Sequence, residues 1–281
     1  MHLHCAGRVL DLQRAVVMGV LNVTPDSFSD GGQYPTPEAA LQAAERMVAA
    51  GAAIIDIGGE STRPGATPVS TEEELQRVLP VVELAAERLP AIISVDTSNP
   101  EVMRRAQASG AHMINDVRAA RVEGALAVLA GSDLAICLTH MLGEPTNMQQ
   151  QPQYRDVVTE VGEYLAERVQ SCRAAGIAAE RLCVDPGFGF GKLLRHNLEL
   201  LRRLGELAAL GVPLMVGLSR KSMAATLAGG AMPARGERVA ASLALATIAV
   251  LHGARIVRAH DVAATVAAVR VASAVNAVTG V

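Results

Sequence analysis

The stretch AAGAAIIDIGGE, residues 49–60, contains the pattern that decides the fold. A helix-like run ends in glycine, a few apolar residues follow, and the apolar run stops at glycine or at a polar residue. Glycine after a helix adopts the left-handed conformation without steric cost, and a continuous apolar run suits a strand buried on both faces. The stretch therefore predicts the end of a helix followed by an interior strand.

The same pattern recurs along the whole chain. It is found again at 108–116, 129–140, 174–185, 210–219 and 251–260, and two strand-like runs without the glycine lie at 15–22 and 91–96. Thr36-Pro37, Ser70-Thr71 and Asn99-Pro100 each place a capping side chain at a predicted helix start. Eight strands alternating with helices fit a (β/α)8 TIM barrel, an α/β fold, better than an open doubly wound sheet. We therefore expect residues 1–281 to form a single barrel domain.

The composition excludes several classes of function. The chain has 25 basic and 28 acidic residues, a net charge of −3, and it contains no Trp, three Phe and three Tyr. A nucleic-acid surface needs basic and aromatic residues, so no nucleic-acid partner is expected. The longest uncharged apolar stretch, Val239 to Ala254, is shorter than the ~20 residues of a membrane span and predicts a buried helix.

The cysteines and the N-terminus predict a cytoplasmic protein with no membrane partner. The four cysteines form no C-x-x-C pair, which favours reduced thiols over disulfides or a zinc site. The first residues contain no apolar run of signal-peptide length and include Arg8 and Asp11.

Polar residues collect where the predicted strands end. In TIM barrels the active site lies at the carboxyl ends of the strands, so chemically useful side chains should gather there. The interiors of the runs are nearly all aliphatic, whereas their ends carry Asn22, Glu60-Ser61-Thr62-Arg63, Asp96, Asn115, His140, Asp185, Ser219-Arg220-Lys221, Arg258 and His260. Eight polar endings predict a ring of side chains around one site.

This ring contains two kinds of group. Asp96, Asn115 and Asp185 supply acceptors and an amide, which suit a flat heterocycle with several N–H donors on one edge. Lys221 and Ser222 stand where a helix is expected to begin, so backbone N–H groups there are available to a carboxylate. The donors that suit a phosphate or diphosphate are Asn22, Arg63, Arg258 and His260. The combination predicts a group-transfer reaction.

Several polar residues also have a purely structural interpretation. A lone Asp after a strand, such as Asp96, often caps a helix, and His140 suits a hydrogen-bonded histidine at the mouth of the barrel. Asp56 lies within a strand and is interpreted as a hydrogen-bonded buried acid. His2 and His4 are spaced like a minimal metal clip, but their place at the terminus does not favour a metal site.

The segment GFGFGK, residues 187–192, is not interpreted as a phosphate loop. No glycine stands at position 186, Leu193 replaces the required Ser or Thr, and the spacing differs from G-x-G-x-x-G. We expect the glycines to let the loop that carries Phe188 and Phe190 approach a ligand closely. Phe28 lies in another glycine-rich loop, and such aromatic faces would cover a planar substrate.

Seven segments in order resemble one enzyme family. They are MGVLNVTPDSFSDGG (18–32), DIGGESTRPGA (56–66), SVDTSNPEV (94–102), GAHMINDV (110–117), DPGFGFGK (185–192), GLSRKS (217–222) and RAHDV (258–262). They span nearly the whole chain and fall at the predicted strand ends. On these segments the chain resembles the dihydropteroate synthases of folate biosynthesis, which are pterin-binding TIM barrels.

The resemblance implies a transferase and its ligands. It would join 4-aminobenzoate to 6-hydroxymethyl-7,8-dihydropterin diphosphate, giving 7,8-dihydropteroate and pyrophosphate. The resemblance further implies Mg²⁺ as cofactor, held by Asn22 on the diphosphate, and a homodimer. Sulfonamides would bind competitively at the aminobenzoate site. Two mobile substrate loops are implied at about 22–36 and 60–70.

The resemblance also assigns roles to individual residues. The pterin would be bound by Asp96, Asn115, Asp185, Phe190 and Lys221. The diphosphate would be bound by Asn22, Thr62, Arg63, Arg258 and His260. The aminobenzoate would be bound by Phe28, Thr62, Pro64, Phe190, Lys221 and Ser222. The catalytic residues would be Asp96, Asp185, Lys221 and Arg63. The chain departs from relatives at Ala259, where a β-branched residue is common, which changes packing behind the anion site and affects no ligand.

The implied mechanism is a dissociative, SN1-like displacement. The pterin methylene would lose diphosphate before the aniline nitrogen attacks, because the electron-rich dihydropterin delocalises the resulting cation. Asp96 and Asp185 would oppose that cation, and the loops would exclude water. The aniline nitrogen is neutral near pH 7, so no histidine-activated nucleophile is expected.

The sequence fits two alternative functions less well. A folate-dependent methyltransferase would have no need for the STRPGA loop, the SRKS segment or the Arg258–His260 anion site. A non-catalytic pterin-binding paralogue would have lost the substrate loops, and both loops are present in the sequence.

Overall fold

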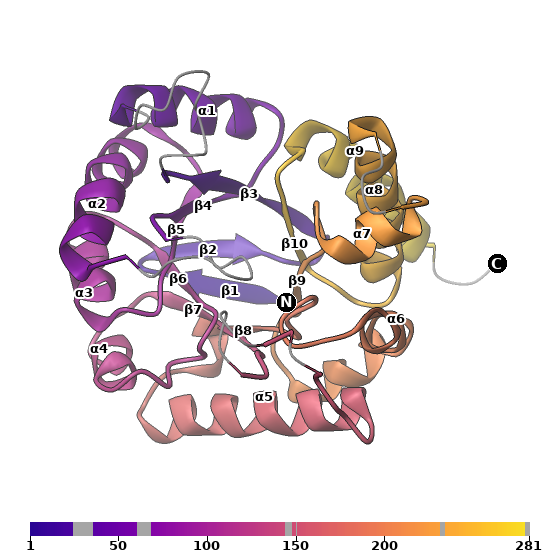
Figure 1. Cartoon of the computed structure of the whole chain (residues 1–281). Helices are drawn as coiled ribbons and strands as arrows, with labels where there is room; N and C mark the ends of the chain where they lie inside the picture. The colour runs from indigo at the N-terminus through magenta and orange to yellow at the C-terminus, as the bar shows by residue number, and fades with distance from the viewer. Residues whose placement is uncertain (25–35, 61–68, 144–147, 150, 231–233, 279–281) are drawn as a thin grey trace.

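The computed structural model describes residues 1–24, 36–60, 69–143, 148–149, 151–230 and 234–278. Within them, eight parallel strands alternate with helices in one sheet (Figure 1). These strands are β3 (Val16–Asn22), β4 (Ile54–Gly58), β5 (Ile92–Asp96), β6 (Met113–Asp116), β7 (Ala135–Thr139), β8 (Leu182–Asp185), β9 (Met215–Gly217) and β10 (Ile256–Ala259). Their order is β8-β7-β6-β5-β4-β3-β10-β9, and a parallel bridge between Val184 and Leu214 connects the two edges. The predicted (β/α)8 barrel is confirmed.

Helices surround the strands as an outer ring in Figure 1. They are α1 (Pro37–Ala49), α2 (Thr71–Arg88), α3 (Pro100–Ala108), α4 (Ala125–Ala130), α5 (Val157–Ala174), α6 (Leu194–Arg202), α7 (Ser222–Leu227), α8 (Arg235–Leu251) and α9 (Val262–Asn276). The three predicted caps are present, since Thr36, Ser70 and Asn99 accept backbone N–H bonds from Ala39, Glu73 and Glu101 at 3.2, 3.2 and 3.0 Å. Capping side chains therefore set where α1, α2 and α3 begin.

Alternation along each strand divides the apolar residues into two layers. On β4, Ile55 and Ile57 pack outward in the large cluster between the sheet and the helices. Ile54 points inward and belongs to a second cluster inside the barrel. Because successive side chains face opposite sides of a strand, Asp56 shares the inner face with Ile54. The inner face therefore changes from apolar to polar toward the carboxyl end of β4.

An antiparallel hairpin, β1 (His2–Cys5) and β2 (Arg8–Asp11), precedes the barrel and was not predicted. Figure 1 shows both strands lying across the inside of the ring of barrel strands. Leu3, Cys5 and Leu12 are fully buried and join the inner apolar cluster. The Ala6 N–H donates to Asp133 O at 3.0 Å, in the segment leading into β7. The hairpin therefore closes the amino-terminal end of the barrel.

The predicted buried helix at 239–254 corresponds to α8, but only one face of α8 is buried. Leu245 and Ala249 face the core, whereas Ile248 and Leu251 are 40% and 42% exposed. None of the described helices combines the length and the hydropathy that a membrane crossing requires. All four cysteines are buried free thiols, as expected.

Candidate active site

Asp56 is the central acceptor at the mouth of the barrel. It is fully buried, and its carboxylate accepts bonds from Ser94 Oγ at 2.7 Å, Asn115 Nδ2 at 3.0 Å and Arg258 Nε at 2.6 Å. These partners come from β5, β6 and β10, so one carboxylate joins three strands to β4. The interpretation of Asp56 as a hydrogen-bonded buried acid is confirmed, but its partners include two predicted site residues.

Arg258 bridges two carboxylates. Its second terminal nitrogen donates to Asp96 Oδ2 at 2.6 Å, while its Nε binds Asp56. Burial raises the pKa of Asp96 to about 7, the Arg258 charge opposes this rise, and neighbouring carboxylates, Asp56 first among them, add to it. Arg258, which was predicted to bind the diphosphate, therefore also contacts Asp96, which was predicted to bind the heterocycle.

Asn115 offers an acceptor with no protein partner. The residue is 2% exposed, its Nδ2 is bound to Asp56, and its Oδ1 has no hydrogen-bond partner among the described residues. A buried amide oxygen without a partner costs free energy, so a ligand N–H donor would satisfy it. This fits the predicted flat heterocycle.

Asn22 and Asp96 lie on either side of Gly58. A Cβ atom added to Gly58 would be 3.6 Å from Asn22 Oδ1 and 3.5 Å from Asp96 Cβ. No group of three or more His, Cys, Asp or Glu able to hold a metal occurs in the described part of the chain. A single amide oxygen still suits Mg²⁺, which keeps several waters and is bound largely through substrate phosphates. The residues present therefore fit this cofactor.

Asp185 and Lys221 meet across Gly217. A Cβ added to Gly217 would lie 3.8 Å from both Asp185 Oδ2 and Lys221 Nζ. Burial lowers the pKa of Lys221 to about 8, although the negative charge of Asp185 opposes this change. Burial likewise raises the pKa of Asp185, which the Lys221 charge opposes. The Lys221 ammonium also lies 4.4 Å from the centroid of the Phe190 ring and donates to Phe188 O.

The loop after β8 requires glycine for steric reasons. Gly187 has φ +70°, and a Cβ added there would lie 1.8 Å from the backbone oxygen of His140. The suggestion that the phenylalanine rings of this loop cover a planar substrate is wrong for Phe188, whose side chain is fully buried in the outer apolar cluster. The glycines instead bring the loop against His140 and Leu142, which follow β7. Of the two phenylalanine rings, only that of Phe190 lies against the Lys221 ammonium.

His260 and Ser222 lie at neighbouring strand ends. His260 Nδ1 is 3.1 Å from Ser219 Oγ, which also accepts the His260 backbone N–H at 3.2 Å. Ser222 is exposed at the first position of α7. The remaining predicted site residues, Phe28, Thr62, Arg63 and Pro64, lie outside the described residues, as do most of both predicted loops.

Sequence reasoning missed the contact between His140 and Lys192. Lys192 is 3% exposed, and its Nζ lies 2.8 Å from His140 Nδ1. Burial, with the adjacent Lys192 charge, lowers the pKa of His140 far below its usual range, so its ring is neutral. His140 is therefore a structural residue bound to a lysine 52 positions away, a separation that no local motif reveals.

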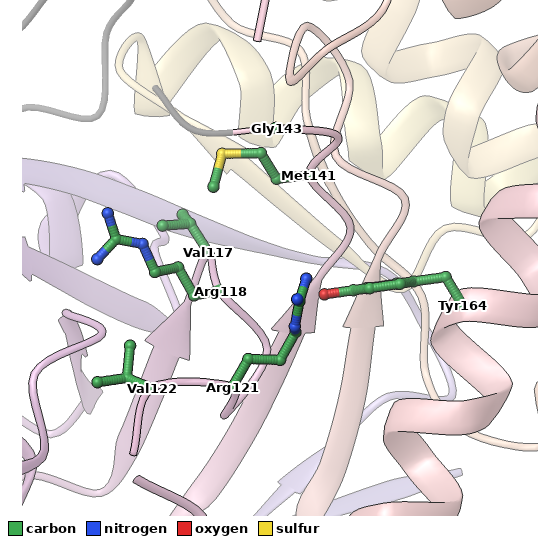
Figure 2. A pocket seen from close by; sticks show the side chains of 7 residues that line it. All are labelled: Val117, Arg118, Arg121, Val122, Met141, Gly143 and Tyr164. Atoms are coloured by element: carbon green, nitrogen blue, oxygen red, sulfur yellow. The ribbon is translucent and has the colours of Figure 1, made fainter. Parts of the chain in front are cut away.

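A cavity of about 330 Å³ lies near the carboxyl ends of β6 and β7 but includes no predicted site residue. Figure 2 shows the Arg121 guanidinium directed toward the Tyr164 hydroxyl, with Val117 and Arg118 on the side of Arg121 away from Tyr164. The cavity is lined by Val117, Arg118, Arg121, Val122, Met141, Gly143 and Tyr164. It is separate from the polar group inside the barrel.

Comparison with known proteins identifies the family. Residues 18–260 match the family model described as pterin binding enzyme. The dihydropteroate synthase of Escherichia coli K12 is 53% identical over 274 residues, covering 98% of this chain and 96% of the relative. The chain belongs to the dihydropteroate synthase family.

Solved structures of dihydropteroate synthases have the same fold. The Yersinia pestis enzyme, in a sulfonamide drug complex, superposes with a TM-score of 0.93 at 51% identity, covering 98% of this chain and 99% of that one. The Xanthomonas albilineans enzyme with 4-aminobenzoic acid gives a TM-score of 0.92 at 51% identity, covering 99% of both chains. Its complex with 7,8-dihydropteroate gives 0.89 at 48%, covering 99% of this chain and 100% of that one. This transferase family is therefore shown by sequence and by structure.

Proposed function

We propose that the chain condenses 4-aminobenzoate with 6-hydroxymethyl-7,8-dihydropterin diphosphate, forming 7,8-dihydropteroate and pyrophosphate in folate biosynthesis. The observation that carries this proposal is the unpartnered Asn115 Oδ1, buried beside Asp96 and Arg258. The similar structures with 4-aminobenzoic acid and with 7,8-dihydropteroate support the assignment of acceptor and product. No described contact favours methyl transfer or a non-catalytic role.

The pterin ring would be held by acceptors inside the barrel and by the loop after β8. Asp96, Asn115 and Asp185 would accept its N–H groups, since their oxygens line three strand ends. Lys221 would donate to a ring acceptor, and the Phe190 ring beneath it would cover a planar ligand.

The diphosphate would bind on the opposite side, with Mg²⁺ held by Asn22. When bound, the ion would neutralise charge on the leaving diphosphate. Arg258 already uses two nitrogens on Asp56 and Asp96, so the diphosphate would meet the remaining nitrogen or displace one contact. His260 would donate to the same anion, and Thr62 and Arg63 would complete the set.

The aminobenzoate would lie between the pterin and α7. Its carboxylate would be received at Ser222, where backbone N–H groups open the helix. Phe190 and Lys221 would contact the ring, and Phe28, Thr62 and Pro64 would cover it. We propose that sulfonamides compete for this position, as the Yersinia pestis sulfonamide complex suggests.

The reaction would break one C–O bond and then form one C–N bond. The C–O electron pair leaves with the diphosphate, whose charge Arg63 would stabilise, and the aniline nitrogen attacks the methylene and then releases its proton to solvent. Asp96 and Asp185 would stabilise the cationic pterin between these steps. His140 is buried and bound to Lys192, and its lowered pKa makes its ring a weak base, so it is not assigned as the base.

The deciding experiment is pyrophosphate release from the pterin diphosphate and Mg²⁺, with and without 4-aminobenzoate. We expect release to depend on aminobenzoate and dihydropteroate to appear in equal amount. Pterin binding without turnover would point to the non-catalytic paralogue. In single-turnover kinetics, Asp96→Asn should slow the chemical step, and an unchanged step would reject the electrostatic role of Asp96.

We also propose a cytoplasmic homodimer that uses α8 and α9. Asn276 Nδ2 donates to Val250 O at 2.9 Å, so the ends of the two helices lie together. Ile248, Leu251, Val271 and Val275 are 40–63% exposed on this surface. Sedimentation should give twice the 29.2 kDa subunit mass, and Leu251→Glu should yield monomers. A monomeric wild-type protein would reject the proposal.

A further inference from the structure

The backbone of residues 187–193 is held almost entirely by side chains. Seven consecutive carbonyl oxygens, from Gly187 to Leu193, each accept a side-chain donor. In chain order the donors are Lys192, Lys221, Gln149, Lys192, Tyr154, Asn197 and Asn197. Much of this segment is buried away from water, so side chains rather than water satisfy its carbonyls and hold its backbone.

Lys192 donates hydrogen bonds to two carbonyl oxygens, one at each end of the turn. Its Nζ donates to Gly187 O at 3.0 Å and to Phe190 O at 3.1 Å, and it lies 2.8 Å from His140 Nδ1. Phe190 N–H also donates to Gly187 O at 3.1 Å. One side-chain nitrogen therefore holds both ends of the turn and also contacts the segment after β7.

A buried ammonium is costly, so its presence needs a reason. Lys192 is 3% exposed, and burial lowers its pKa well below the usual range although the charge of Asp185 opposes this. An apolar side chain of similar length would fill the same space without the cost of desolvating a charge. What an apolar chain would not supply is the pair of bonds to Gly187 and Phe190. The ammonium is thus best explained by the backbone geometry that it imposes.

That geometry extends to Lys221. Fixing the Phe190 carbonyl fixes the backbone from which its ring extends, and Lys221 Nζ lies 4.4 Å from the centroid of that ring. Lys221 also donates to Phe188 O, within the same loop. We propose that Lys192 is a positioning residue for the synthase reaction, setting the Phe190 ring and the Lys221 ammonium in place through the loop backbone. This inference rests on the proposed assignment of Phe190 and Lys221 to the substrate site.

The test compares Lys192→Met with a matched variant at the other end of β8. Arg181 precedes that strand and donates to Leu134 O, Leu129 O and Ser132 Oγ at 2.9, 3.0 and 3.2 Å, so Arg181→Met also removes a cation that binds three acceptors. Both variants should lose stability. Only Lys192→Met should lower kcat/KM, by about 10- to 100-fold, because misplaced binding groups affect the reaction steeply. Similar stability losses with wild-type kcat and KM in both variants would overturn the proposal.

A second readout follows the contact itself. Lys192 Nζ lies 2.8 Å from His140 Nδ1, so the NMR chemical shifts of the His140 ring at neutral pH should change in Lys192→Met. Unchanged shifts would show that Lys192 does not act there. Because this readout needs no turnover, it separates failure of this inference from failure of the proposed function, which the wild-type assay tests. Should Lys192→Met not fold, Lys192→Gln takes its place with the same expected and refuting results.

Discussion

Replacing Gly187 with alanine tests whether the close approach of two loops holds the site together. Gly187 has φ +70°, and an added Cβ would lie 1.8 Å from the backbone oxygen of His140. Gly211 has the same φ of +70°, and nothing lies within 4 Å of its added Cβ. The two substitutions therefore share the left-handed backbone cost and differ in the steric contact alone.

The expected effects follow from these two terms. Gly211→Ala should lower the free energy of unfolding by about 1–2 kcal/mol, the cost of a Cβ in the left-handed region. In Gly187→Ala the methyl group must also move by at least 1.2 Å to reach the 3.0 Å that real Cβ contacts respect. That movement breaks the bonds of the Gly187 N–H to Asp185 and of its carbonyl to Lys192. At about 1–3 kcal/mol for each buried group left unsatisfied, the extra loss is about 2–6 kcal/mol.

Urea unfolding followed by circular dichroism measures both losses, and steady-state kinetics measures the effect on the site. Gly187→Ala should be at least about 2 kcal/mol less stable than Gly211→Ala, the lower end of the two-bond estimate. It should also lose activity, because Phe190 belongs to the displaced loop and the Asp185 carboxylate is bonded to it through the Gly187 N–H. Equal stability in the two variants, or full activity of Gly187→Ala, would refute the reasoning.

Three further predictions concern buried ionisable groups. Asp56→Asn removes a carboxylate from the buried ion pair with Arg258 and should lower the free energy of unfolding, measured in urea, by about 3–5 kcal/mol. A loss under about 1 kcal/mol, which is typical of exposed ion pairs, would contradict this prediction. Burial lowers the pKa of His112 from 6.5 to about 4. As the pH falls through this range, the His112 ring takes up a proton in the unfolded chain before it does so in the folded chain, so stability is lost. His112→Asn should remove up to about 3 kcal/mol of that loss, and a stability–pH curve parallel to the wild type would count against it. Burial raises the pKa of Glu74 from 4.5 to about 7, so stability is lost as the pH rises through that range. Glu74→Gln should therefore exceed the wild type in stability at pH 8 by more than at pH 4, and an equal difference at both pH values would exclude this explanation.

The barrel was predictable because its signals are local. Glycine followed by an apolar run marks each of six strands, and capping residues mark three helix starts, so neighbours in sequence determine these elements. The β1–β2 hairpin was missed because its four-residue strands carry His2 and His4 on the exposed side and lack a continuous apolar run. Its burial depends on the barrel that it closes.

The site was predicted where strand ends define it and missed where strand interiors or loop contacts do. Asp56 and Gly58 lie two residues apart on one strand and therefore share a face. The period-two alternation of a strand could thus have placed Asp56 on the inner face, beside the site. The contact of Lys192 with His140 had no such signal. Likewise, composition alone did not reveal that Phe188 turns into the core while Phe190 turns toward Lys221.

The hairpin and the closure of the sheet bear on how the chain is synthesised. β3 pairs with β10, so that Val16 lies beside Ile256, and Leu3, Leu12 and Ile256 share one apolar cluster. The first strands to leave the ribosome must therefore wait for the last strand before either pairing or packing is complete. Such distant contacts slow folding and leave apolar surface uncovered in the meantime. For this chain, we expect the amino-terminal segment to stay incompletely packed until β10 has been synthesised.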